Sequence, residues 1–62
     1  MPASEEQHIE TEIRSLGMKL LTARPTRAMI DAFDCMVGEF YGQEKVDRDL
    51  FFWAQAIVGR VQ

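Results

Sequence analysis

One cysteine and one histidine, Cys35 and His8, are the side chains in this sequence that could form a nucleophile and its base. Such a pair needs hydrogen-bond reach and a third group that orients the histidine, and the spacing here enforces neither. His8 falls among glutamates in the first turn of an expected helix, which predicts a solvated side chain. Cys35 falls at the edge of an apolar helix face, which predicts a small, half-buried hydrophobic residue.

Three pairs of carboxylates, Glu5–Glu6, Asp31–Asp34 and Asp47–Asp49, raise the question of acid–base or metal chemistry. Hydrolytic carboxylates need a cleft that holds the substrate between them, and so short a chain has little room for one. A single histidine and a single cysteine are too few for a structural zinc site, which takes four such ligands. We interpret the acids as helix caps and solvated faces. We therefore expect no enzyme, metal, cofactor or small-molecule substrate.

The size of the chain limits how much apolar surface it can bury by itself. Sixty-two residues make a single small helical domain, residues 1–62. A domain of this length buries only about 60% of its extended surface on folding. Cys35 is the only cysteine, so no disulfide within the chain can compensate. Association with another chain is the remaining means of stabilisation.

The charge and the absence of a long apolar stretch indicate the compartment and exclude some partners. Ten acidic and seven basic side chains give a net charge of −3, which argues against broad attraction to nucleic acid or anionic lipid. No stretch approaches the roughly 20 apolar residues of a membrane-spanning helix. A lone cysteine and an acidic, polar start predict a cytoplasmic protein without a secretory signal.

The apolar spacing predicts an all-α fold of three short helices, over about residues 4–23, 26–41 and 47–60. Ser4 and Gln7 form a capping box at the start of the first helix, and Pro25 ends it. Gly17 lies beside the apolar stripe and would admit close approach of another helix. That stripe consists of Ile9, Ile13, Leu16 and Leu20.

The second and third expected helices carry wider apolar faces. Thr26 and Asp47 are their expected N-caps, and Gly42 is the expected stop of the second helix. The second helix is apolar over about half its circumference, and the third is apolar on two sides. The face of the second helix comprises Met29, Phe33, Met36, Val37, Phe40 and Tyr41, widened by Ile30 and Ala32. The main face of the third comprises Leu50, Trp53, Ala54, Ile57, Val58 and Val61.

Short connections favour antiparallel neighbours, so we expect helices two and three to form an antiparallel hairpin. The first helix would cross this hairpin or extend from it. Two-fold homodimers are the commonest assemblies, and two hairpins would complete a four-helix bundle. We therefore expect dimerisation to complete the bundle.

All six aromatic residues lie in the second and third helices, which is more than three small helices can surround. Phe52 lies about 160° from the middle of the main apolar face of the third helix, so it is the best candidate for a partner-facing side chain. Aromatic residues are enriched at protein interfaces. The chain is thus predicted to be a non-catalytic protein–protein interaction or regulatory module, and its partner to be itself, another protein or both. The candidate interface comprises Phe52, Phe51, Trp53, Ala56 and Tyr41.

The alternative function is a small dimeric regulator that binds nucleic acid. Arg24 and Arg27, with Lys19 one or two turns earlier, form a basic corner that could contact phosphates. A helix-turn-helix reading would give a recognition helix with almost no side chains that read bases. Nucleic acid is therefore the less favoured partner. Membrane-surface binding is also disfavoured, because the third helix has aromatics without a basic polar face.

Overall fold

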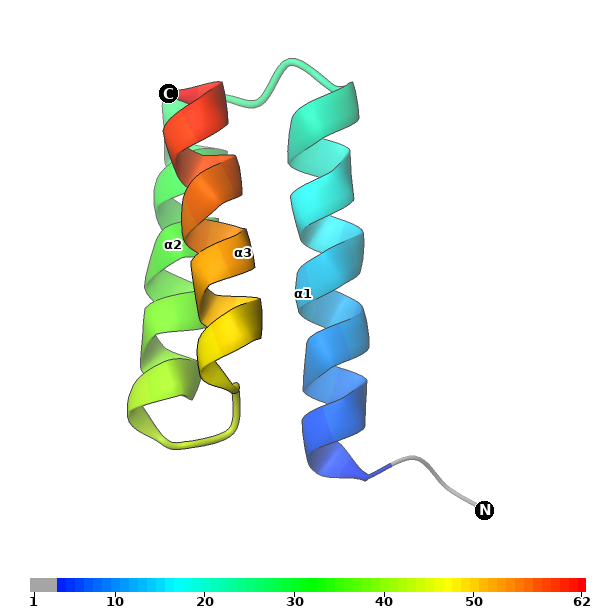
Figure 1. The fold of residues 1–62 in the computed structure, drawn as a ribbon. Helices are drawn as coiled ribbons and strands as arrows, with labels where there is room; N and C mark the ends of the chain where they lie inside the picture. Colours follow the sequence, from blue (N-terminus) through cyan, green and yellow to red (C-terminus); the bar gives the residue numbers. More distant parts are fainter. Residues whose placement is uncertain (1–3) are drawn as a thin grey trace.

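The computed structural model describes residues 4–62, which form three helices, α1 (Glu5–Thr22), α2 (Arg27–Gly42) and α3 (Arg48–Val61). The predicted all-α class with three helices is confirmed, and no strand occurs among these residues. The chain runs along α1, returns along α2 and reverses again along α3 (Figure 1). The C-terminal ends of α1 and α3 therefore share one end of the molecule with the N-terminal end of α2.

The three N-caps are those that the sequence indicates. The side chains of Ser4, Thr26 and Asp47 each accept a hydrogen bond from the backbone N–H three residues on, at 3.1, 3.2 and 2.8 Å. Each bond satisfies one of the donors that the first turn of a helix leaves without an intrahelical partner. Local hydrogen bonding therefore fixes where each helix begins.

The stop of α2 differs from the expected one. Gly42 is the last helical residue, but the left-handed backbone falls on Glu44, at φ 61°. The Glu44 N–H donates to the carbonyl of Tyr41 (3.0 Å), and the Lys45 N–H donates to that of Phe40 (2.9 Å). This is the Schellman pattern, in which the left-handed position is usually a glycine. Hydrogen bonding rather than the freedom of a glycine ends this helix.

The core lies along the line where the three helices meet. Ile13 of α1 and Val37 of α2 are fully inaccessible to solvent, and no polar side chain is buried among residues 4–62. The core consists of Ile9, Ile13, Leu20, Ile30, Phe33, Val37, Val46, Leu50, Ala54, Ile57 and Val58. Gly17 is buried against α3, so the helix that approaches this glycine is the third.

The apolar face of α2 is only partly covered by the other two helices. The buried line of α2 is Ile30, Phe33 and Val37, whereas Met29 and Ala32 are exposed. The predicted face spans about half of the helix, and two neighbouring helices cover only its middle. One edge of α2 therefore remains apolar and accessible beside α1.

Candidate functional site

The residues capable of nucleophilic or metal chemistry are not brought together. His8 is exposed near the start of α1, and Cys35 is exposed on α2. The expectation of a half-buried Cys35 was wrong, because this residue lies about 200° around the helix from the buried Phe33. Within residues 4–62, no three or more histidine, cysteine, aspartate or glutamate side chains are grouped so as to hold a metal ion.

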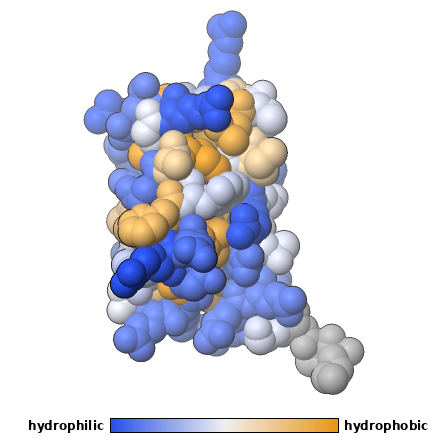
Figure 2. Space-filling view, in the orientation of Figure 1, coloured by the Kyte–Doolittle hydropathy of each residue, from blue (hydrophilic) through white to orange (hydrophobic). Residues whose placement is uncertain are grey.

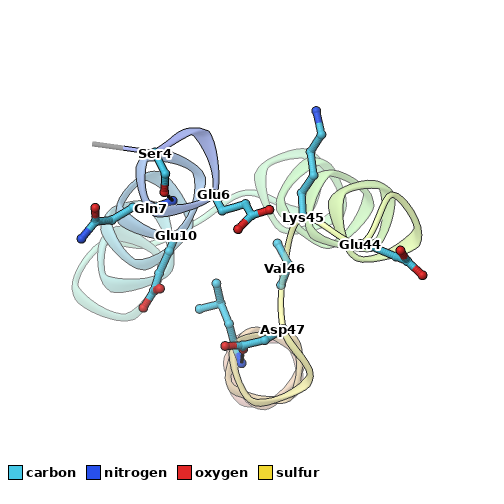
Figure 3. Close-up of a pocket in the computed structure, with 9 residues that line it drawn as sticks. Ser4, Glu6, Gln7, Glu10, Glu44, Lys45, Val46 and Asp47 are labelled. Carbon is cyan, nitrogen blue, oxygen red and sulfur yellow. Dashed lines mark hydrogen bonds between the residues drawn. The ribbon is translucent and has the colours of Figure 1, made fainter. Parts of the chain in front are cut away.

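A polar hollow of about 330 Å³ lies between the start of α1 and the turn that joins α2 to α3. Glu6 points into the gap between α1 and this turn, while Glu44 points away from it (Figure 3). Asp47 is engaged as the cap of α3. The hollow is lined by Ser4, Glu6, Gln7, Glu10, Glu44, Lys45, Val46, Asp47 and Leu50.

An ion pair spans the side of this hollow. Lys45 Nζ lies 2.7 Å from Glu5 Oε1. The hydrogen bond from Lys45, reinforced by its charge, lowers the pKa of the Glu5 carboxyl. The carboxylates at this end thus cap a helix, pair with a basic side chain or face solvent.

The candidate interface residues Tyr41 of α2 and Phe51 and Phe52 of α3 lie together where the two helices meet. The rings of Tyr41 and Phe51 stack with centroids 4.1 Å apart and planes 12° apart. The ring centroid of Phe52 lies 6.0 Å from that of Phe51, and Phe52 is 59% exposed. Ala56, one helical turn after Phe52, is also exposed. Phe51 and Tyr41 cover each other in part, whereas Phe52 projects into solvent. We call Phe52, Phe51, Tyr41 and Ala56 the aromatic face.

Trp53, the fifth candidate interface residue, faces a different neighbour. Its indole covers Gly17, and the Arg14 guanidinium carbon lies 5.1 Å from the ring centroid. Trp53 is half-buried in the seam between α1 and α3. The candidate set therefore divides into the aromatic face and a tryptophan that belongs to the packing of α1 on α3.

No protein-family model, curated protein or solved structure matches this chain. Among residues 4–62, no helix has both the length and the apolar character needed to cross a membrane. Function therefore has to be inferred from the surfaces themselves.

A second apolar surface, which sequence reasoning missed, is a groove of about 270 Å³ between α1 and α2. Met29 and Met36 belong to the apolar face expected for the second helix, and in the structure Met29 is 47% exposed and Met36 only half-buried. The sequence does contain a signal for this groove, because the apolar face of α2 is wider than the surface that α1 and α3 can cover. The α1–α2 groove is lined by Leu16, Lys19, Leu20, Met29, Ala32, Phe33 and Met36.

On the side of the molecule drawn in Figure 2, apolar atoms reach the surface in separate patches. The view in Figure 2 shows such patches over α3 and its seam with α1, with hydrophilic atoms between them and below. Across residues 4–62, the large apolar side chains with the greatest exposure are Met18, Leu21, Met29 and Phe52. Met18 and Leu21 belong to α1, Met29 borders the α1–α2 groove, and Phe52 belongs to the aromatic face.

The basic corner lies at the end of the molecule where α1 stops and α2 begins. Lys19 is in the last turn of α1 and borders the α1–α2 groove, Arg24 lies in the connection, and Arg27 opens α2. All three are exposed. Arg27 Nε lies 3.7 Å from Asp31 Oδ1, with both side chains well solvated. Solvated pairs of this kind contribute little to stability, so the pair with Asp31 does not keep Arg27 from contacting a partner.

Proposed function

We propose that this chain is a small, cytoplasmic, non-catalytic protein–protein interaction or regulatory module that works as a homodimer. Its aromatic face binds an apolar helix face of another protein. The observation that carries this proposal is the 59% exposure of Phe52 beside the Tyr41–Phe51 stack. Burial of this surface against a second chain, rather than a chemical step, is the mechanism.

The energetics favour Phe52 as the anchor of such a contact. Burying one phenylalanine side chain contributes about 1.5–3 kcal/mol. The neighbouring Tyr41 and Phe51 rings are already stacked, so little side-chain freedom remains to be lost on binding. Ala56 has a small side chain, which lets a partner helix approach the backbone of α3 next to the Phe52 ring. A few large side chains that become fully buried at the centre of an interface usually carry most of the binding energy.

A photo-crosslinking amino acid at position 52 tests this proposal in the cells that make the protein. The matched control carries the same group at Met18, which is 51% exposed on α1. We expect position 52, and not position 18, to cross-link to a discrete second protein. That protein is then purified, and its affinity is measured for the unmodified chain, Phe52→Glu and Met18→Glu.

Phe52→Glu should weaken this affinity by about 10- to 100-fold, because the buried ring is replaced by a charge. Met18→Glu should leave the affinity unchanged, and circular dichroism should show both variants folded. Equal affinities for Phe52→Glu and the unmodified chain would contradict the proposal. Cross-links from position 52 to copies of this chain alone would instead make the aromatic face the self-association surface.

A further inference from the structure

The α1–α2 groove is an apolar surface that the aromatic face does not account for. Its lining is apolar apart from Lys19 at the rim, and it leaves Met29 in contact with water. Leu16 and Leu20 from α1 oppose Met29, Ala32 and Met36 from α2, so the groove runs along the two helices. An occupant must supply a matching apolar stripe along a helix.

We propose that this occupant is a second copy of the chain, docked groove to groove across a two-fold axis perpendicular to the helices. Each α1 then lies antiparallel on the partner's α1, and each α2 antiparallel on the partner's α2. This inference rests on the homodimer in the proposed function and places it on a surface separate from the aromatic face. The aromatic face remains free for a different protein.

The charges along α1 are complementary in this arrangement. Relative to Leu16, Glu12 lies about 40° and Lys19 about 60° around the helix, both toward the same side. Lys19 and Leu16 both line the groove, so Glu12 shares their stripe. When two such helices cross antiparallel between positions 15 and 16, each Glu12 meets the partner's Lys19. Neither side chain has an ion-pair partner within residues 4–62, since the three pairs there involve other residues.

The apolar positions on α2 have the same symmetry. Met29 and Met36 lie at equal distances on either side of a point between Ala32 and Phe33. A two-fold axis through this point sets each Met29 against the partner's Met36, and the small Ala32 next to the axis lets the helices come close. The centre on α1 lies about as many residues before Thr22, where α1 ends, as the centre on α2 lies after Arg27, where α2 begins at the same end of the molecule, so the two centres lie at about the same height. One axis therefore satisfies both helices.

The distribution of charge over the molecule favours the antiparallel direction. One end of the bundle carries the four basic side chains Lys19, Arg24, Arg27 and Arg60, partly offset by Asp31. The opposite end carries Glu5, Glu6, Glu10, Glu44, Asp47 and Asp49, partly offset by Lys45 and Arg48. Antiparallel docking sets the basic end of each copy beside the acidic end of its partner, whereas parallel docking would set like beside like.

A charge exchange across the proposed interface tests this arrangement in the full chain. The dimer dissociation constant is measured by sedimentation equilibrium for Lys19→Glu, Glu12→Lys and the variant with both changes. Each single change turns both symmetric contacts into repulsions and should weaken dimerisation about tenfold. The double variant should recover most of the loss. Arg60→Glu, which makes the same charge change on α3 at the same end, is the matched control and should have a much smaller effect.

Ala32→Glu and Ala56→Glu separate the two surfaces. Ala32→Glu places two carboxylates next to the proposed axis and should abolish dimerisation, whereas Ala56→Glu should leave it intact. Lys19 and Glu12 are exposed, so their variants stay informative even if Ala32→Glu fails to fold. Loss of the dimer in Ala56→Glu or Phe52→Glu, with wild-type constants for the Glu12 and Lys19 variants, would overturn the groove assignment. A wild-type monomer at all concentrations would overturn the homodimer itself, while cross-linking from position 52 would still test the aromatic face.

Discussion

Gly17 lies under the Trp53 indole, and the indole can take this position because glycine has no side chain. A Cβ atom at Gly17 would lie 2.7 Å from Cη2 and 2.9 Å from Cζ3 of Trp53, and 3.0 Å from Cδ1 of Ile57. These distances are shorter than van der Waals contact, so an added methyl group forces the indole or α3 to shift. Overpacking of this kind costs about 1–3 kcal/mol.

We expect Gly17→Ala to be less stable than Gly38→Ala by about 1–3 kcal/mol in urea unfolding. Both glycines lie inside helices, so alanine brings a similar gain in helix propensity, about 1 kcal/mol, at each. A Cβ at Gly38 would meet nothing within 4 Å, so only Gly17→Ala carries the packing cost. In a Trp53→Phe background, which lacks both indole atoms nearest to that Cβ, the difference should shrink. Equal stabilities for the two alanine variants would show that the indole is not seated on Gly17.

At the scale of helices, the pair between Glu5 and Lys45 joins the start of α1 to the turn between α2 and α3. The two residues lie 40 positions apart, and this pair connects α1 to the turn between α2 and α3. The Glu5 side chain is exposed, and the hydrogen bond and charge of Lys45 lower its pKa below the ordinary value of 4.5. A carboxyl whose pKa is lowered by folding stabilises the native state above its unfolded pKa. That contribution is lost as the pH falls through the native pKa.

Lys45→Met should therefore raise the pKa of Glu5 back toward 4.5, as followed by the carboxyl ¹³C shift in an NMR titration. The free energy of unfolding of this variant should also fall less steeply as the pH drops below 4.5. Lys45→Arg, which keeps the charge, should retain most of the lowered pKa. An unchanged Glu5 titration in Lys45→Met would show that the pair does not persist in solution.

The sequence predicts the starts of the helices more accurately than the end of α2. Ser4, Thr26 and Asp47 are identifiable as caps because a cap depends on a hydrogen bond three residues away. The left-handed residue after α2 escaped prediction, because glycine is the usual choice there and Glu44 takes the position instead. Local chemistry therefore predicts where helices begin better than how they end.

For the whole molecule, periodicity shows which face of a helix is apolar but not which neighbour covers it. Phe51, Phe52 and Trp53 are adjacent in sequence and were expected to share one interface. In the fold, Phe51 stacks on Tyr41 and Trp53 covers Gly17, so Phe52 is left in solvent. The α1–α2 groove was not predictable for the same reason, since it depends on how far apart the two helices settle.

A homodimer formed through the α1–α2 groove should make the thermal midpoint depend on protein concentration. Association stabilises the native state and not the unfolded chain, so mass action raises the midpoint as the concentration rises. For a domain of this size, we expect roughly 5–10 °C for each hundredfold increase above the dissociation constant. Calorimetry over a wide concentration range measures this shift.

The thermal midpoint of Lys19→Glu should depend less on protein concentration than that of the unmodified chain, because the dimer of this variant dissociates at a higher concentration. High salt should also flatten the dependence of the unmodified chain, since the contacts between Glu12 and the partner's Lys19 lie at the exposed rim and are screened. Burial of Met29 and Met36 is not screened by salt, so part of the dependence should persist. A midpoint that does not move with concentration would mean that three helices alone account for the stability, and the groove would then be open to water in the native state.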